Sequence, residues 1–206
     1  MRGGLLHLAH GWTLVGGPMV SAALVADFIR PAVRAMPSSM ASRLGFCRIS
    51  ILLADPEVSS RWTESGEALE VSLVRGDSPN HDLAMELLLC LGQALWERLS
   101  DEQLRAYWCL LAEEIRDGVT GEIDEQALDQ KRSLLASRLH ARSSRQLARY
   151  GRASFAGTAA EYVHCLWHDV TARSGPGYLP AAQLRRRLET FAAWFPPDRG
   201  YRLFSA

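Results

Sequence analysis

The sequence lacks an excess of charge of either sign, because its 206 residues carry 23 Lys and Arg and 23 Asp and Glu. A chain without a basic surplus has no overall field that attracts nucleic acid or an anionic membrane, so we expect neither as a partner. The sequence also lacks a glycine-rich phosphate loop, a G-x-S-x-G nucleophile motif, an EF-hand loop and an internal repeat. The function classes that these motifs identify are therefore excluded, and no cofactor is predicted.

Cysteine is scarce and widely spaced. The four cysteines form no C-x-x-C pair and mostly stand in apolar helical contexts, which predicts neither a disulfide framework nor a zinc–thiolate motif. We expect reduced thiols packed in the core of a cytoplasmic protein. These residues are Cys47, Cys90, Cys109 and Cys165.

An uninterrupted apolar run of membrane-spanning length is missing as well. Residues 5–28 are largely apolar, but His7, His10, several glycines and Pro18 interrupt them, so no transmembrane helix is predicted. The ALVA stretch before Asp27 faintly resembles a signal-peptidase site, which leaves a weak secretion signal as an alternative.

What the chain does contain is enough apolar material for one sizeable core, with 48% hydrophobic residues and no linker that divides it. We predict a single domain over residues 1–206, in which 1–79 carry an N-terminal helix and strands and 80–206 are helical. The predicted fold class is α+β and predominantly helical. A short N-terminal β-sheet or hairpin is followed by a helical bundle around a buried central helix.

Local patterns indicate where the elements lie. Apolar spacing favours a helix over residues 18–36 with a kink at Pro31, while β-rich and alternating segments favour strands at 47–56 and 67–77. Ser100 and Gln103 match a capping box, and Gly118 follows the helix that they begin. One or two further helices are predicted within residues 121–151, and others over 154–170 and 180–194. In the last of these, Arg185, Arg186 and Arg187 are expected to lie largely in solvent.

The central helix is predicted at residues 80–98. Between Leu83 and Trp96 only Glu86 and Gln93 are strongly polar, which is typical of a helix buried on nearly every side. Buried polar groups require hydrogen-bond partners, so Glu86 and Gln93 either meet such partners inside the fold or line a cleft.

Two stretches resemble a known family. The segment LLLCLGQALWERLS is similar to the active-site helix of the zincin metallopeptidases, especially the gluzincins, where LLHELGHALWE is typical. In this alignment Leu89 stands at the first zinc histidine, Cys90 at the general-base glutamate and Gln93 at the second histidine. The segment SFAGTAAEYV is similar to the downstream gluzincin helix, often SFAETFAEYV, that supplies a glutamate as third ligand. Gly157 takes that position directly, and Glu161 takes it if the alignment shifts by one turn.

The resemblance covers two helices and their spacing, about half of the chain. It implies a zincin-like fold that has lost peptidase activity, since zinc hydrolysis needs imidazole or carboxylate ligands and a nearby base. Such a pseudoenzyme would retain a cleft lined by Glu86, Gln93 and Glu161. We therefore expect a binding, scaffold or regulatory module with an unidentified peptide or protein partner and no metal at the degenerate positions.

Two other interpretations stay open. Glu161, His164 and His168 follow one another at i, i+3 and i+7, which is metal-ligand spacing on one helical face. These three residues, with or without His81, would form a displaced site of a metal-dependent hydrolase. Alternatively the chain is an unrelated helical protein-interaction module, because leucine-rich buried helices occur in many folds.

Overall fold

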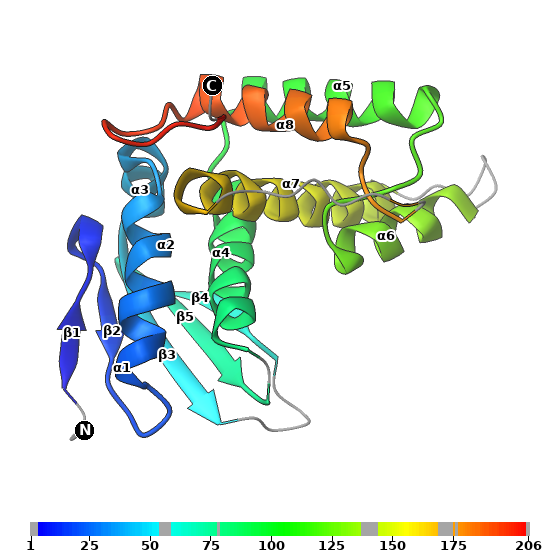
Figure 1. Ribbon diagram of the computed structural model, residues 1–206. Coiled ribbons are helices and arrows are strands. Elements are labelled where there is room, and N and C mark those ends of the chain that lie inside the picture. The colour runs from blue at the N-terminus through cyan, green and yellow to red at the C-terminus, as the bar shows by residue number, and fades with distance from the viewer. Residues whose placement is uncertain are drawn as a thin grey trace.

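The computed structural model describes residues 4–53, 59–77, 79–136, 144–168, 175 and 177–204. Its first part contains a five-stranded mixed sheet in the order β1-β2-β3-β5-β4 (Figure 1). Strands β2, β3 and β5 run parallel, while β1 and β4 run antiparallel to their neighbours at the two edges. The strands are β1 Leu5–His7, β2 Thr13–Val15, β3 Phe46–Leu53, β4 Arg61–Ser65 and β5 Ala68–Arg75.

Both predicted strands are present, but they form a parallel pair within a larger sheet instead of a hairpin. Ile49 of β3 lies beside Val71 of β5, and both side chains are fully buried. The sequence did not predict β1, β2 and β4 because runs of three to five residues show too little alternation to identify a strand. Residues 54–56 of the first predicted strand lie outside the described residues.

The helix predicted upstream of the sheet is interrupted in its middle. The segment 22–35 begins as α1 Ala22–Leu24, widens into the π-helical turn η2 Val25–Ile29 and continues as α2 Arg30–Ala35. The Arg30 N–H donates to the Val25 carbonyl, five residues back. Pro31 has no N–H and its ring crowds the preceding turn, so the wider turn relieves the conflict at the predicted position. The short helices η1 Ala9–Gly11 and α3 Ser38–Leu44 complete this part of the chain.

The central helix is α4 Asn80–Trp96, and most of its side chains are buried as predicted. It follows β5 and packs against both β5 and α7 Ser144–Trp167, so it joins the sheet part to the helical part (Figure 1). The close approach to α7 occurs at Gly92, where a Cβ would lie 2.9 Å from the Cα and the carbonyl oxygen of Ala156. A larger residue at this position would push the two helices apart.

The helical part also contains α5 Asp101–Arg116, α6 Glu125–Ala136 and α8 Ala181–Trp194. The capping box of Ser100 and Gln103 is present, and Gly118 follows α5 with a φ of 77°. Buried apolar residues from both parts form one contiguous cluster. Within the described ranges, no helix has the length and apolarity needed to cross a membrane.

The expectation that all three consecutive arginines of α8 lie in solvent is wrong for Arg187. Arg185 and Arg186 are exposed, whereas Arg187 is fully buried. Arg187 follows Leu184 by three residues and precedes Phe191 by four, so helical geometry places it on the apolar face. A buried guanidinium requires complete hydrogen bonding, and carboxylates from other elements provide it.

Candidate functional site

Two of the three zincin-like positions on α4, Leu89 and Cys90, carry packed side chains. Leu89 is half-buried and packs against the apolar core. The Cys90 side chain is buried, and this burial, together with the charge of Glu86, raises the pKa of its thiol to about 12. The thiol therefore stays protonated at neutral pH, which does not suit the role of a general base.

The space beside Gly157 is already filled. A Cβ at Gly157 would lie 2.0 Å from Oδ2 of Asp124, a residue at the start of α6. Oδ1 of Asp124 accepts a hydrogen bond of 2.9 Å from the Ala127 N–H and so caps α6. Its Oδ2 is buried without a hydrogen-bond partner, and burial raises the Asp124 pKa to about 6. A glutamate at residue 157 does not fit unless Asp124 moves.

Gln93 lies in a polar cleft between α4, α6 and α7. The cleft has a volume of about 240 Å³. The Gln93 Nε2 donates a long hydrogen bond of 3.5 Å to Oε1 of Gln126. The lining residues are Gln93, Gln126, Gln130, Arg149, Arg152 and Ala153. Amides and guanidinium groups thus surround the position that the alignment gives to the second zinc histidine.

Glu86 and Glu161, predicted to line a cleft with Gln93, have partners elsewhere. The Ser60 hydroxyl donates to the Glu86 carboxylate and accepts a bond of 2.9 Å from the Val74 N–H, which ties α4 to β5. Glu161 lies beside His164, with Oε2 3.8 Å from Nδ1. No hydrogen bond joins Glu161 to Glu86 or Gln93 among the described contacts.

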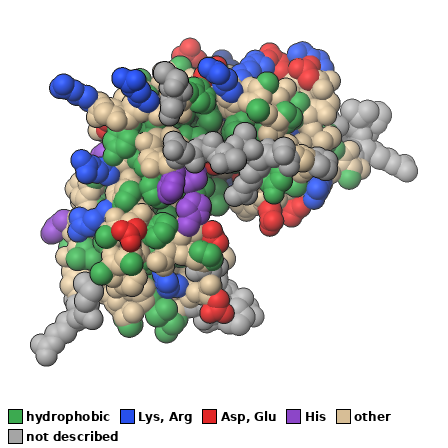
Figure 2. Space-filling model, viewed as in Figure 1, with side chains coloured by type: hydrophobic (Ala, Val, Ile, Leu, Met, Phe, Trp, Pro, Cys, Tyr) green, Lys and Arg blue, Asp and Glu red, His purple; other side chains and the backbone are tan. Residues whose placement is uncertain are grey.

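The three histidines of the displaced-site hypothesis come together. His81 lies in the first turn of α4 and His164 in the last turn of α7, and their Nε2 atoms are 3.1 Å apart. The ring centroid of His168 lies 6.2 Å from that of His81 and 5.5 Å from that of His164. Figure 2 shows histidine side chains gathered at the surface at the bend between the two parts of the molecule. As they stand, no three His, Cys, Asp or Glu side chains within the described residues form a group that could hold a metal ion.

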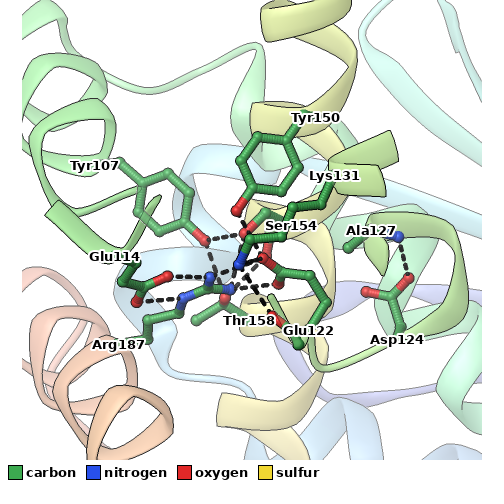
Figure 3. A network of polar contacts seen from close by, with 11 residues as sticks. Tyr107, Glu114, Glu122, Asp124, Ala127, Lys131, Tyr150, Ser154, Thr158 and Arg187 are labelled. Carbon is green, nitrogen blue, oxygen red and sulfur yellow. Dashed lines mark hydrogen bonds and ion pairs between the residues drawn. The ribbon is translucent and has the colours of Figure 1, made fainter. Parts of the chain in front are cut away.

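The second polar cluster is a buried ion-pair network that the sequence did not predict (Figure 3). Arg187 uses its five N–H groups on Glu114, Glu122 and Ser154, at 2.5–3.0 Å. Glu122 also accepts from Lys131 at 3.0 Å and Tyr150 at 2.6 Å. Although burial alone raises the pKa of Glu122, the charges of Arg187 and Lys131 lower it to about 2.

The network has the properties of a structural cluster. Its four charged side chains are at most 1% exposed, and two cations balance two carboxylates. A substrate therefore has no access to these groups. The sequence of α8 does indicate that Arg187 is buried, because this residue lies on the apolar face of the helix. A run of three arginines, however, favours the interpretation that all three are exposed to solvent.

A larger cleft of about 400 Å³ lies between η1, η2, α2, the end of α7 and the C-terminal segment, and none of the predicted site residues lines it. Its walls include Arg30, Arg34, Trp167 and Tyr201.

Comparison with known proteins gives no relative. No family model, no curated protein and no solved structure matches the chain. The zincin resemblance therefore depends on the two motif helices alone.

Proposed function

We propose that the chain is a zincin-like domain without peptidase chemistry, and that it acts as a binding module whose cleft beside Gln93 receives a carboxylate-bearing segment of a peptide or protein. The observation that carries this proposal is which side chains occupy the four motif positions and whether they are packed or face a cleft. Gln93 opens onto a polar cleft, whereas Leu89 and Cys90 are packed and the space at Gly157 holds Asp124.

The order of elements supports the zincin-like part of the proposal. After β1 and β2, a helical segment, strands β3 to β5 and a buried helix follow one another, and that buried helix packs against the helix that carries the second motif. This is the arrangement that the resemblance implies. A reducing compartment such as the cytoplasm belongs to the proposal as well, because all four cysteines are free thiols.

The chemistry of the motif positions argues against hydrolysis. A zinc-bound water needs ligands to hold the ion and a base to take its proton. Leucine provides neither, the Cys90 thiol holds its proton, and a glutamine amide is a poor zinc ligand. We therefore expect no peptide cleavage, with or without added zinc.

The cleft suggests the class of ligand. Its volume of about 240 Å³ is smaller than a typical small-molecule pocket, so it suits one side chain or a chain terminus. Glutamine amides both donate and accept hydrogen bonds, which matches peptide groups, and guanidinium groups bind carboxylates. Because Arg152 already bonds Glu97, we assign the carboxylate contact to Arg149.

Binding is tested with acetylated, fluorophore-labelled tetrapeptides that end in a free Asp or Glu, compared with the same peptides amidated at both carboxyl groups. We expect the acidic peptides alone to raise fluorescence polarisation, and Arg149→Gln to weaken binding at least tenfold. Arg105→Gln, at an exposed arginine of α5 outside the cleft, is the matched control and should leave binding unchanged. Equal binding of acidic and amidated peptides would contradict the assigned ligand class.

The zincin-like backbone is tested separately by restoring the motif. The variant combines Leu89→His, Cys90→Glu and Gln93→His with Gly157→Glu, and Asp124→Ala makes room for the new glutamate. A His164→Gln background removes the histidine pair from consideration. Zinc should then raise the melting temperature, because a ligand that binds only the native state stabilises it. If the variant is folded and zinc leaves its melting temperature unchanged, the helical interaction module is the better interpretation.

A further inference from the structure

The strongest unassigned feature is the contact between His81 and His164. These residues are 83 positions apart in the sequence, yet their Nε2 atoms lie 3.1 Å from each other where the start of α4 meets the end of α7. Two imidazoles bound to one tetrahedral zinc ion, with bonds of 2.0–2.1 Å, have nitrogen atoms roughly 3.3 Å apart. The observed spacing is therefore close to that of two ligands of one ion.

The surroundings of both rings suit metal binding through Nε2. Nδ1 of His81 lies 3.5 Å from the Asp82 carboxylate, and Nδ1 of His164, which has no hydrogen-bond partner among the described residues, lies 3.8 Å from the Glu161 carboxylate. Without a metal ion, the two Nε2 atoms share one hydrogen bond, in which one ring donates and the other accepts. A cation bound by both Nε2 atoms replaces that hydrogen bond and leaves the proton of each ring on Nδ1, beside these carboxylates.

We propose that His81 and His164 are the preformed ligands of a site for a divalent transition-metal ion, and that rotation of His168 supplies the third. His168 follows His164 by one helical turn, and its N–H donates to the His164 carbonyl at 2.9 Å, so both rings project from the same face of the helix. The His168 side chain is exposed. Imidazole ligands select ions such as Zn²⁺, Ni²⁺ or Cu²⁺ over Mg²⁺ and Ca²⁺.

The ligands of this site are distinct from the zincin-like positions 89, 90, 93 and 157, and the site does not depend on the proposed binding function. Its ligands come from the first turn of α4 and the last turn of α7, and the His81 ring also contacts Phe28 of η2 edge-on. A metal ion here joins the start of α4 to the end of α7. We expect it to clamp this junction, so that metal binding stabilises the native state.

The experiment titrates the full chain with ZnCl₂ and NiCl₂ by calorimetry, with MgCl₂ for comparison, and records the absorption spectrum of the Co²⁺ form. We expect one ion per chain, the visible absorption of four-coordinate Co²⁺, and no binding of Mg²⁺. At a free zinc concentration one hundred times the dissociation constant, the melting temperature should rise by about 5–10 °C. Wild-type protein that binds neither Zn²⁺ nor Ni²⁺ at micromolar concentrations overturns the proposal.

Variants assign the ligands. His81→Gln and His164→Gln should each weaken binding more than tenfold, and Glu161→Gln about tenfold, because loss of an orienting carboxylate typically costs 10–100-fold in affinity. His7→Gln, on an exposed imidazole of β1, is the matched control and should bind as the wild type does. Circular dichroism without metal establishes that each variant is folded. Undiminished affinity in folded His164→Gln also overturns the proposal.

Discussion

Removal of the Arg187 side chain should destabilise the protein far more than removal of its neighbour Arg186. In Arg187→Met, Glu122 keeps Lys131 and Tyr150 as partners, but Glu114 loses the cation that binds both of its carboxylate oxygens. A buried carboxylate without a counterion costs about 3–5 kcal/mol when its partner is removed. For a chain of this length that corresponds to a fall in melting temperature of roughly 10 °C.

A second substitution separates the charge from the packing. Glu114→Gln in the Arg187→Met background removes the unpaired charge and leaves a neutral amide, whose unmade hydrogen bonds cost about 1–3 kcal/mol. The double variant should therefore be more stable than Arg187→Met alone. Such a reversal arises only if the two groups interact directly.

The free energy of unfolding is measured by urea titration, followed by far-ultraviolet circular dichroism and tryptophan fluorescence. Arg186→Met is the matched control, because Arg186 forms an exposed pair with Glu113 and solvent screens such pairs. The reasoning is refuted if Arg187→Met costs less than about 1 kcal/mol. It is also refuted if the double variant is no more stable than the single one.

Three further predictions follow from buried groups. Because the folded-state pKa of Asp124 is raised from 3.8 to about 6, stability from this group is present below pH 4 and is lost as the pH rises to 6. Asp124→Asn should abolish that loss, so the variant should be up to about 3 kcal/mol more stable than wild type at pH 7. The prediction is contradicted if urea titrations give the same difference in stability between variant and wild type at pH 4 and at pH 7. Gly92→Ala should cost about 1–3 kcal/mol despite the better helix propensity of alanine, because the Ala156 backbone blocks the new Cβ, and a raised melting temperature would contradict this. Native protein should react with iodoacetamide at exposed Cys109 and not at Cys90, and equal labelling rates by mass spectrometry would disprove the buried-thiol assignment.

The sequence predicted the features of the fold that depend on local periodicity. Three such features depend only on residues within one or two helical turns of each other, and the structure contains all three. They are the buried helix α4, the capping box at Ser100 and the interruption of the helix near Pro31. The parallel arrangement of β3 and β5 was not predictable in this way. It depends on a pairing between segments that local pattern does not specify.

The contacts within the candidate site depend on the crossing of helices. The spacing of His164 and His168 identified one face of α7, but the approach of His81 results from how α4 packs against it. Nothing in the local sequence indicated that Asp124 fills the space at Gly157, because a residue in a loop has no periodic neighbours to place it. Arg187 is the reverse case. Its spacing from the apolar residues of α8 indicated that it is buried, whereas its charge suggested that it lies in solvent.

The ion-pair network also determines when the helical part can close during synthesis. Glu114 and Arg187 are separated by 73 positions, so at 5–20 residues per second the ribosome adds the arginine ~4–15 s after the glutamate. During that interval Glu122 can already bind Lys131 and Tyr150, whereas Glu114 lacks its counterion and its burial costs free energy. Helix α5 is therefore less stable in its final place until α8 arrives. A nascent chain arrested before residue 187 should keep α5 accessible to protease, and one extended past α8 should protect it.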